Sequence, residues 1–121
     1  MAIKETPSQT AGPFVHIGTM PALAGLKTKQ TGPANILAHD GTLGERIRIE
    51  GLIHDGAGAL VKDALVEIWQ ANAGGQYGSN DFSGFGRAAT DFDTGLFYFE
   101  TVKPGATPFA DGRMQAPHVT L

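Results

Sequence analysis

Three residues, Tyr77, His118 and Thr120, raise the question of a metal site. In "PHVTL", residues 117–121, His118 stands two positions before Thr120, and the alternation of a β-strand would point both side chains to one face. An imidazole is a good metal ligand, whereas a neutral threonine hydroxyl is a poor one. Tyr77 lies in "ANAGGQYGSNDFSGFG", residues 71–86, whose five glycines predict a long loop. Because sites often form on loops of a β-scaffold, Tyr77 is the third candidate.

Each of these side chains also has an ordinary structural role. A single histidine on a strand is more often a hydrogen-bonded interior or interface residue than a ligand. A tyrosine in a Gly-rich loop more often packs or forms hydrogen bonds. We therefore favour structural roles for His118 and Tyr77.

The elements that would position these residues are β-strands. Three segments have the alternation or the β-branched and aromatic content of strands: residues 45–55, 64–71 and 96–101. In the first segment Ile47 and Ile49 share one face, and in the last Phe97 and Phe99 do. Gly-rich turns separate the segments, which predicts an all-β fold of the β-sandwich type. The first two strands either pair as a hairpin or lie apart in a Greek key.

Two further side chains have a predicted place outside the site. Trp69 ends a strand of apolar residues, so we expect it in the core or in a subunit interface. Arg87 precedes a strand, and we expect it either to pair with an acidic residue such as Asp91 or Asp93 or to be solvated.

Composition limits the classes of function. The chain has 121 residues with a formal net charge of -3, and its Lys and Arg residues are scattered, so neither nucleic acid nor a membrane surface is expected as a partner. It has no cysteine, which excludes thiolate metal sites and fits a reducing compartment. Because the sequence has no apolar run of signal-peptide or membrane-span length, we predict a cytoplasmic protein.

The N-terminal part differs from the rest of the chain. Residues 1–44 carry four of the seven prolines and show little alternation. Such a segment is either disordered or laid against another surface. We therefore predict an N-terminal arm and irregular segment over residues 1–44 and a partial β-sandwich core over residues 45–121.

Four stretches of the sequence resemble the intradiol ring-cleavage dioxygenases: "TPSQTAGPFVHIG" (6–18), "VEIWQANAGGQY" (66–77), "GFGRAATDFDTGLFYFETVKPG" (84–105) and "APHVTL" (116–121). The first is similar to the α subunits of the two-chain members, and the others mark the family at large. The resemblance implies a β-sandwich of the intradiol dioxygenase type and an αβ heterodimer that assembles further. It also implies a non-haem Fe(III) that cleaves 3,4-dihydroxybenzoate with O2 between the two hydroxylated carbons.

The resemblance further implies an iron site of two tyrosines and two histidines. The first tyrosine matches Tyr77 and the first histidine matches His118, but the second tyrosine falls at Thr107 and the second histidine at Thr120. A catalytic arginine of the family falls at Gln115. With half of the ligands replaced, we predict no metal ligand and no catalytic residue in this chain, and an Fe(III) held by the partner β subunit.

A role in substrate binding is implied for the arm. In the α subunits that this chain resembles, the "TxGP" segment reaches the partner's iron site, and it corresponds here to Thr10, Gly12, Pro13 and Phe14. A glycine lets the backbone approach a ligand, and the following proline fixes the direction of the chain. Phe14 would supply an aromatic wall without the hydroxyl that many relatives have. The structural alternative is an arm that only packs.

The segments 49–69 and 90–105 also resemble transthyretin-like or carboxypeptidase-regulatory β-sandwiches, which bind other domains without catalysis. The arm favours the dioxygenase α subunit, because such modules begin close to their first strand. A single-chain catechol or hydroxyquinol dioxygenase is opposed by the missing ligands and by the lack of a helical N-terminal segment. Since "PHVTL" ends inside a predicted strand, we expect a sandwich that is incomplete, and apparently truncated, at its C-terminal end.

Overall fold

The computed structural model describes residues 4–26 and 34–121. The chain forms two units, Met1–Thr31 and Gly32–Leu121, and each is treated separately below. Within the described residues, no helix has the length and apolar character needed to cross a membrane.

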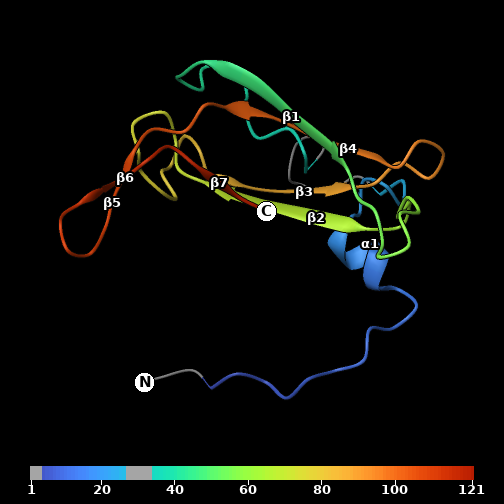
Figure 1. The fold of residues 1–121 in the computed structure, drawn as a ribbon. Helices are drawn as coiled ribbons and strands as arrows, with labels where there is room; N and C mark the ends of the chain where they lie inside the picture. The colour runs from blue at the N-terminus through green and yellow to red at the C-terminus, as the bar shows by residue number, and fades with distance from the viewer. Residues whose placement is uncertain (1–3, 27–33) are drawn as a thin grey trace. The chain divides into compact units, whose positions relative to one another are not determined.

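The first unit contains an extended segment followed by one short helix, α1 (Val15–Thr19; Figure 1). A turn precedes the helix, in which the Val15 N–H donates to the Gly12 carbonyl at 3.1 Å. Pro13 occupies the second position of this turn, where its fixed φ is favourable. The Thr19 hydroxyl donates to the Val15 carbonyl at 2.8 Å and so closes the last turn of the helix.

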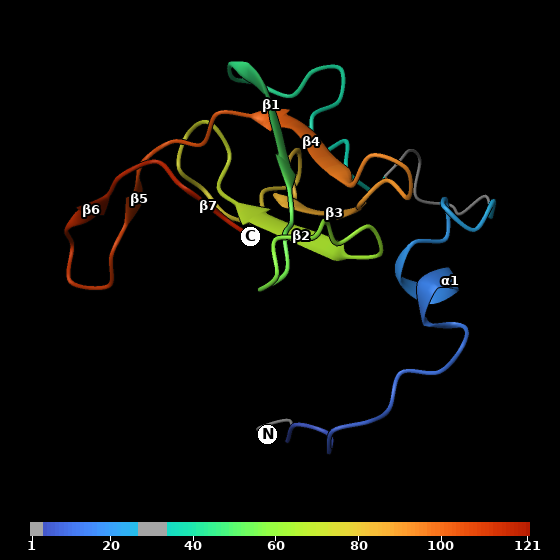
Figure 2. The ribbon, with the colours of Figure 1, turned by 45° about the vertical axis from the view of Figure 1, so that its right-hand side comes forward.

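The second unit is built from two antiparallel sheets that face each other (Figures 1 and 2). One sheet pairs β1 (Arg46–Leu52) with β4 (Leu96–Val102). In the other, β2 (Leu65–Gln70) lies between β3 (Phe85–Ala89) and β7 (Val119–Thr120). The predicted β-sandwich and its three predicted strands are therefore confirmed, and the first two strands lie in different sheets instead of forming a hairpin.

The core lies between the sheets and contains residues from both. Its buried apolar side chains are those of Leu37, Ile68, Phe82, Ala88, Phe97, Phe99 and Val102. In β4 the alternation places Phe97 and Phe99 inward, as predicted, with their ring centroids 6.2 Å apart. Burial of side chains this large supplies most of the free energy that holds the two sheets together.

Residues 34–44 were predicted to belong with the arm, but the described contacts place residues 34–38 with the sandwich. The Leu37 N–H donates to the Glu100 carbonyl at 2.8 Å, and the Glu100 N–H donates to the Asn35 carbonyl at 3.0 Å. Leu37 is buried in the core and lies against Gly86, where a Cβ would come within 2.6 Å of its side chain. The sequence does not predict that residues 34–38 belong to the sandwich, because they show no strand-like alternation.

The segment 102–112 was predicted to be a loop, and the structure adds a small hairpin to it. β5 (Thr107–Pro108) pairs with β6 (Met114–Gln115), so that Thr107 lies opposite Gln115. The hairpin stands apart from both sheets in Figures 1 and 2. Two-residue strands are too short to show a period in the sequence.

Candidate functional site

Tyr77 and His118 are in direct contact although 41 positions separate them in the sequence. The Tyr77 hydroxyl lies 3.2 Å from His118 Nε2. The other ring nitrogen, Nδ1, lies 2.8 Å from the carbonyl of Ala116. If Nδ1 donates to that carbonyl, Nε2 is left as the acceptor of the tyrosine hydroxyl. The two family positions that are retained in this chain therefore form one hydrogen-bonded pair.

The sheet holds this pair on one outer face. Trp69 in β2 lies opposite Thr120 in β7, and partners in an antiparallel pair share a face. His118 lies two positions before Thr120 and so projects to the same side. The Tyr77 ring stacks on Trp69 with centroids 5.5 Å apart and an interplanar angle of 19°. Trp69 is 43% exposed and is thus not a core residue of this unit.

Asn72 shapes the loop that carries Tyr77. Its Oδ1 accepts hydrogen bonds from the backbone N–H groups of Gly74 at 2.9 Å and Gln76 at 3.0 Å. Its own N–H donates to the Gln76 carbonyl at 2.8 Å, and its Nδ2 donates to Ser79 Oγ at 3.3 Å. An asparagine used in this way replaces backbone partners and fixes a turn. The sequence signal for this turn is an asparagine two positions before a pair of glycines.

Gln70 joins the loop to the other sheet. Its side chain is fully buried, and Nε2 donates to the carbonyls of Ala71 at 3.0 Å and Val102 at 2.9 Å. The Thr101 hydroxyl donates to Gln70 Oε1 at 2.8 Å. Because Val102 and Thr101 belong to β4, this network ties β2, just before the Tyr77 loop, to the facing sheet. No pattern in the sequence marks Gln70 as a positioning residue.

The residues present do not fit a ferric site in this chain. Tyr77 and His118 supply one phenol and one imidazole, and no group of three or more His, Cys, Asp or Glu side chains suited to a metal occurs within residues 4–26 and 34–121. Thr107 is buried, and its hydroxyl has no hydrogen-bond partner among the described residues. A neutral hydroxyl at Thr107 or Thr120 is a weak substitute for the phenolate and imidazole donors that the family uses.

The arm presents its predicted substrate-binding residues to solvent within its own unit. Thr10, Gly12, Pro13 and Phe14 are all exposed, and Phe14, just before α1, is 73% exposed. A Cβ added at Gly12 would meet no atom of the described residues within 4 Å. Nothing in this part of the chain therefore requires a glycine at position 12. A contact between these residues and a substrate stays a prediction.

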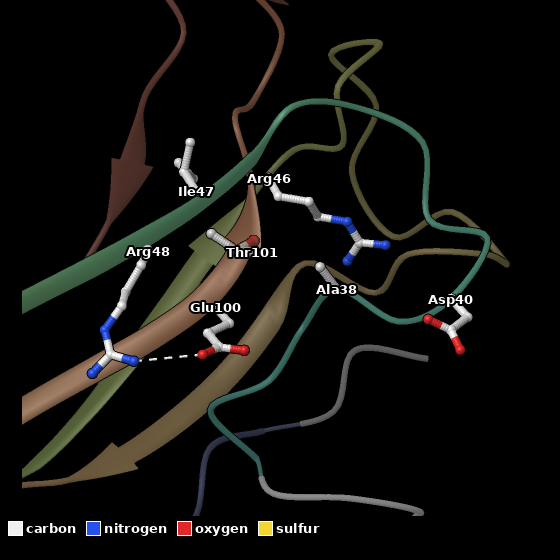
Figure 3. A pocket seen from close by; sticks show the side chains of 7 residues that line it. All are labelled: Ala38, Asp40, Arg46, Ile47, Arg48, Glu100 and Thr101. Atoms are coloured by element: carbon white, nitrogen blue, oxygen red, sulfur yellow. Dashed lines mark hydrogen bonds and ion pairs between the residues drawn. The ribbon is translucent and has the colours of Figure 1, made fainter.

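A separate groove is lined by residues of β1, of β4 and of the segment before β1 (Figure 3). It is lined by Ala38, Asp40, Arg46, Ile47, Arg48, Glu100 and Thr101. Its cations have partners: Arg46 donates to the carbonyls of His39 and Thr42, and Arg48 lies 3.5 Å from Glu100. Because its arginines are paired and it has no nucleophile, this groove is not a candidate active site.

Arg87 forms its ion pair with neither of the two aspartates suggested for it. Its Nε lies 2.6 Å from Glu67 Oε1, directly across the β2–β3 pair. The expected pairing with an acidic residue is confirmed, but the partner is Glu67 instead of Asp91 or Asp93, because Glu67 is the cross-strand neighbour of Arg87.

The comparisons with known proteins agree with this geometry. The family model described as Dioxygenase (Dioxygenase_C) matches residues 19–119. The chain is 45% identical over 124 residues to the protocatechuate 3,4-dioxygenase alpha chain of Pseudomonas putida and 35% identical over 127 residues to that of Burkholderia cepacia. Each match covers 98% of this chain and 62% of the relative, so the chain spans less than two thirds of the length of these relatives. The beta chain from Burkholderia cepacia is 39% identical over 87 residues, which cover 64% of this chain and 37% of that one.

Solved structures show the same fold. The dioxygenase domain of a carbohydrate-binding fusion protein from a Streptomyces species has a TM-score of 0.61 at 24% identity, covering 96% of this chain and 64% of that one. The 3-chlorocatechol 1,2-dioxygenase of Rhodococcus opacus also has a TM-score of 0.61, at 22% identity, with 69% of this chain and 40% of that one covered. The family match also decides against the transthyretin-like alternative. A sandwich that keeps a tyrosine and a histidine at two of the family's positions, and that the family model matches over most of its length, belongs to the dioxygenase family.

Proposed function

We propose that this chain acts as the α subunit of a protocatechuate 3,4-dioxygenase. The complex would cleave 3,4-dihydroxybenzoate between its hydroxylated carbons and insert both atoms of O2, which gives 3-carboxy-cis,cis-muconate. The observation that carries the proposal is the 45% identity to an α chain over 98% of this sequence. A match of that extent includes residues 10–14 of the arm, which lie before the family model's first residue at 19.

In this proposal the chain does not bind the iron of the complex. The donor set that remains, Tyr77 and His118, is engaged in a mutual hydrogen bond and lacks two of the family's four ligands. The Fe(III) is then held by the partner β subunit, and this chain contributes no catalytic residue. The similarity to a β chain at 39% identity supports an ancestry in which one of two related subunits kept the metal.

The arm is the proposed functional part of this chain. Thr10, Gly12, Pro13 and Phe14 would form part of the wall of the substrate pocket in the partner. Two observations support this role: the residues are exposed, and a side chain at Gly12 would be free of clashes with the described residues. The structure of this chain does not require a glycine at position 12. A glycine there is explained if the backbone at Gly12 must approach a bound ligand closely.

The proposed partners are the β subunit, further αβ pairs, the small aromatic substrate and O2. An association with another chain is supported by large apolar side chains on the outer face of the β2–β3 pair, where Leu65, Trp69 and Phe85 are each more than 40% exposed. Aromatic residues are typical of the centre of protein interfaces. The absence of cysteine fits a reducing compartment, so a cytoplasmic location is part of the proposal.

The proposal is tested by the Gly12→Leu variant in a complex reconstituted with the β subunit. If Gly12 lines the pocket, the leucine side chain fills space that the substrate needs, and the KM for 3,4-dihydroxybenzoate should rise by about tenfold or more, with iron content unchanged. The matched control is Gly56→Leu, because Gly56 is also exposed and a Cβ there also meets no described atom within 4 Å. A Gly12→Leu complex that assembles normally with an unaltered KM would show that the arm only packs.

A further inference from the structure

The substrate of the proposed function has polar groups at both ends of its ring. In 3,4-dihydroxybenzoate the two hydroxyl groups, between which the ring is cleaved at the iron, lie at one end, and the carboxylate lies at the other. A carboxylate that leaves water without a hydrogen-bond donor is strongly disfavoured, so the pocket must supply a donor for it. The arm, which would wall the pocket without holding the iron, is a candidate source of that donor.

The basic side chains of the described arm are few. Within residues 4–26 they are Lys4 and His16. Lys4 lies beside the oppositely charged Glu5 and six positions before Thr10, whereas His16 follows Phe14 by only two positions. His16 is also exposed within its own unit. It is therefore the basic side chain of the arm that lies nearest to the predicted pocket residues in the sequence.

The backbone of the arm places His16 about one helical turn after Gly12. The Val15 N–H donates to the Gly12 carbonyl at 3.1 Å, in the turn that leads into α1. The Met20 N–H donates to the His16 carbonyl at 2.8 Å, at the end of the same helix. Residues four positions apart on such a path are neighbours on its surface, and helical side chains tilt back toward the N-terminal end. The His16 side chain is thereby directed toward the backbone at Gly12.

The space over Gly12 is empty in this unit. A Cβ added there would meet no atom of the described residues within 4 Å. Neighbouring Cβ atoms one turn apart are separated by about 5–6 Å, and the glycine leaves its half of that space unfilled. A small anionic group could therefore lie against the Gly12 backbone and within reach of the His16 ring.

We propose that His16 binds the carboxylate of the substrate, in the space over Gly12. The proposal rests on the proposed function, because it requires the arm to reach the pocket of the partner. An imidazole N–H donates to a carboxylate from either the neutral or the protonated ring, and the bond is stronger when the ring is charged. His16 is then a specificity residue, which favours a dihydroxybenzoate over a catechol that has no carboxylate.

The test compares two ligands in a complex reconstituted with the β subunit and carrying His16→Leu. One ligand is 3,4-dihydroxybenzoate, and the other is 4-methylcatechol, which has a methyl group in place of the carboxylate and is measured as a competitive inhibitor. We expect the KM for 3,4-dihydroxybenzoate to rise by about tenfold or more, and the inhibition constant of 4-methylcatechol to stay within about twofold. His16→Lys retains a donor for the carboxylate and should bring the KM back to within about threefold of the unchanged complex.

The matched control is His54→Leu, because His54 is an exposed histidine of the sandwich unit, and it should alter neither constant. An unaltered KM in His16→Leu would overturn the proposal. An equal loss of affinity for both ligands would also overturn it, since it would assign His16 a structural role.

Gly12→Leu separates a failure of this proposal from a failure of the proposed function. If Gly12→Leu raises the KM and His16→Leu does not, the arm lines the pocket and the carboxylate is bound by other residues. If neither variant alters the KM, the proposed role of the arm fails together with the role of His16.

Discussion

At the scale of single residues, Gln70 and Asn72 matter most for the candidate site. The sequence identified Tyr77 and His118 individually from their chemistry, but not their contact, since no local pattern reports on residues 41 positions apart. It missed Gln70, because a glutamine in a strand looks like a surface residue until its burial is known. The side chains that position Tyr77 are therefore polar groups whose partners come from distant parts of the chain.

Replacing Gln70 with leucine should destabilise the fold strongly. The change leaves the Thr101 hydroxyl and the Val102 carbonyl buried without their partner, and each unsatisfied buried group costs about 1–3 kcal/mol. We expect the free energy of unfolding, measured with urea, to fall by about 2–4 kcal/mol. Gln76→Leu is the control, because Gln76 is exposed in the loop that carries Tyr77. This change should alter the free energy of unfolding by less than about 0.5 kcal/mol. Equal effects of the two variants would show that the Gln70 network is not a structural tie.

At the scale of elements, the strands with strong alternation were predictable and the others were not. β1 and β4 have apolar residues that alternate along the strand, and β2 is rich in β-branched and aromatic residues. β3, with the sequence "FGRAA", carries small residues because Gly86 must admit Leu37, so its alternation is weak and it was assigned partly to a loop. Residues 34–38 associate with β4 through backbone hydrogen bonds. Such bonds do not depend on residue type, so the pattern of side chains does not predict them.

The loop that carries Tyr77 packs closely against the turn after β4. A Cβ at Gly105 would lie 2.5 Å from the Ala73 carbonyl oxygen and 2.6 Å from the Gly75 nitrogen. We expect Gly105→Ala to push the two segments apart and to lower the free energy of unfolding by about 1–3 kcal/mol. Gly56→Ala is the matched control, because its Cβ would meet no described atom, and it should have an effect below about 0.5 kcal/mol. The two variants are compared by thermal unfolding. Equal stability of Gly105→Ala and Gly56→Ala would show that the loop and the turn are not in close contact in solution.

The turn before β4 makes stability depend on acid pH through Asp91. Hydrogen bonds from the Thr94 N–H, the Thr94 hydroxyl and the Asp93 N–H lower the pKa of Asp91 below its ordinary value of 3.8. A lowered pKa in the folded state means that the ionised carboxylate stabilises the fold above pH 3.8, and that this contribution disappears as the pH falls through the folded pKa.

Asp91→Asn should therefore unfold more readily than the unchanged chain near neutral pH, and the difference should shrink below pH 3.8. The comparison is made by urea unfolding over a series of pH values. Asp93→Asn in the same turn is the control, since within the described part of the chain no hydrogen bond to its carboxylate is observed. A difference that stays constant through the acid range would assign the effect of Asp91→Asn to packing and not to charge.

At the scale of the whole molecule, the chain is a dioxygenase-family sandwich with threonine at two positions where the resemblance implies iron ligands. The family and the fold were predictable because they rest on contiguous motifs that survive in the sequence. The prediction that this chain holds no iron comes from residue identity alone, at Thr107 and Thr120, and stays a prediction. What the sequence did not reveal is that Tyr77 and His118 remain joined, with the tyrosine stacked on Trp69. This contact joins the loop that carries Tyr77 to the segment that leads into β7.

In the function proposed here, this chain shapes the active site of a complex without holding its iron. The most direct measurement is the iron content of the reconstituted αβ complex in which this chain carries Tyr77→Phe and His118→Gln, compared with the complex of unchanged chains. We expect equal iron per αβ pair in both complexes, the same phenolate-to-iron absorption, and no iron in this chain when it is purified alone. Loss of iron from the variant complex, or stoichiometric ferric iron with a phenolate absorption band in the isolated chain, would contradict the account.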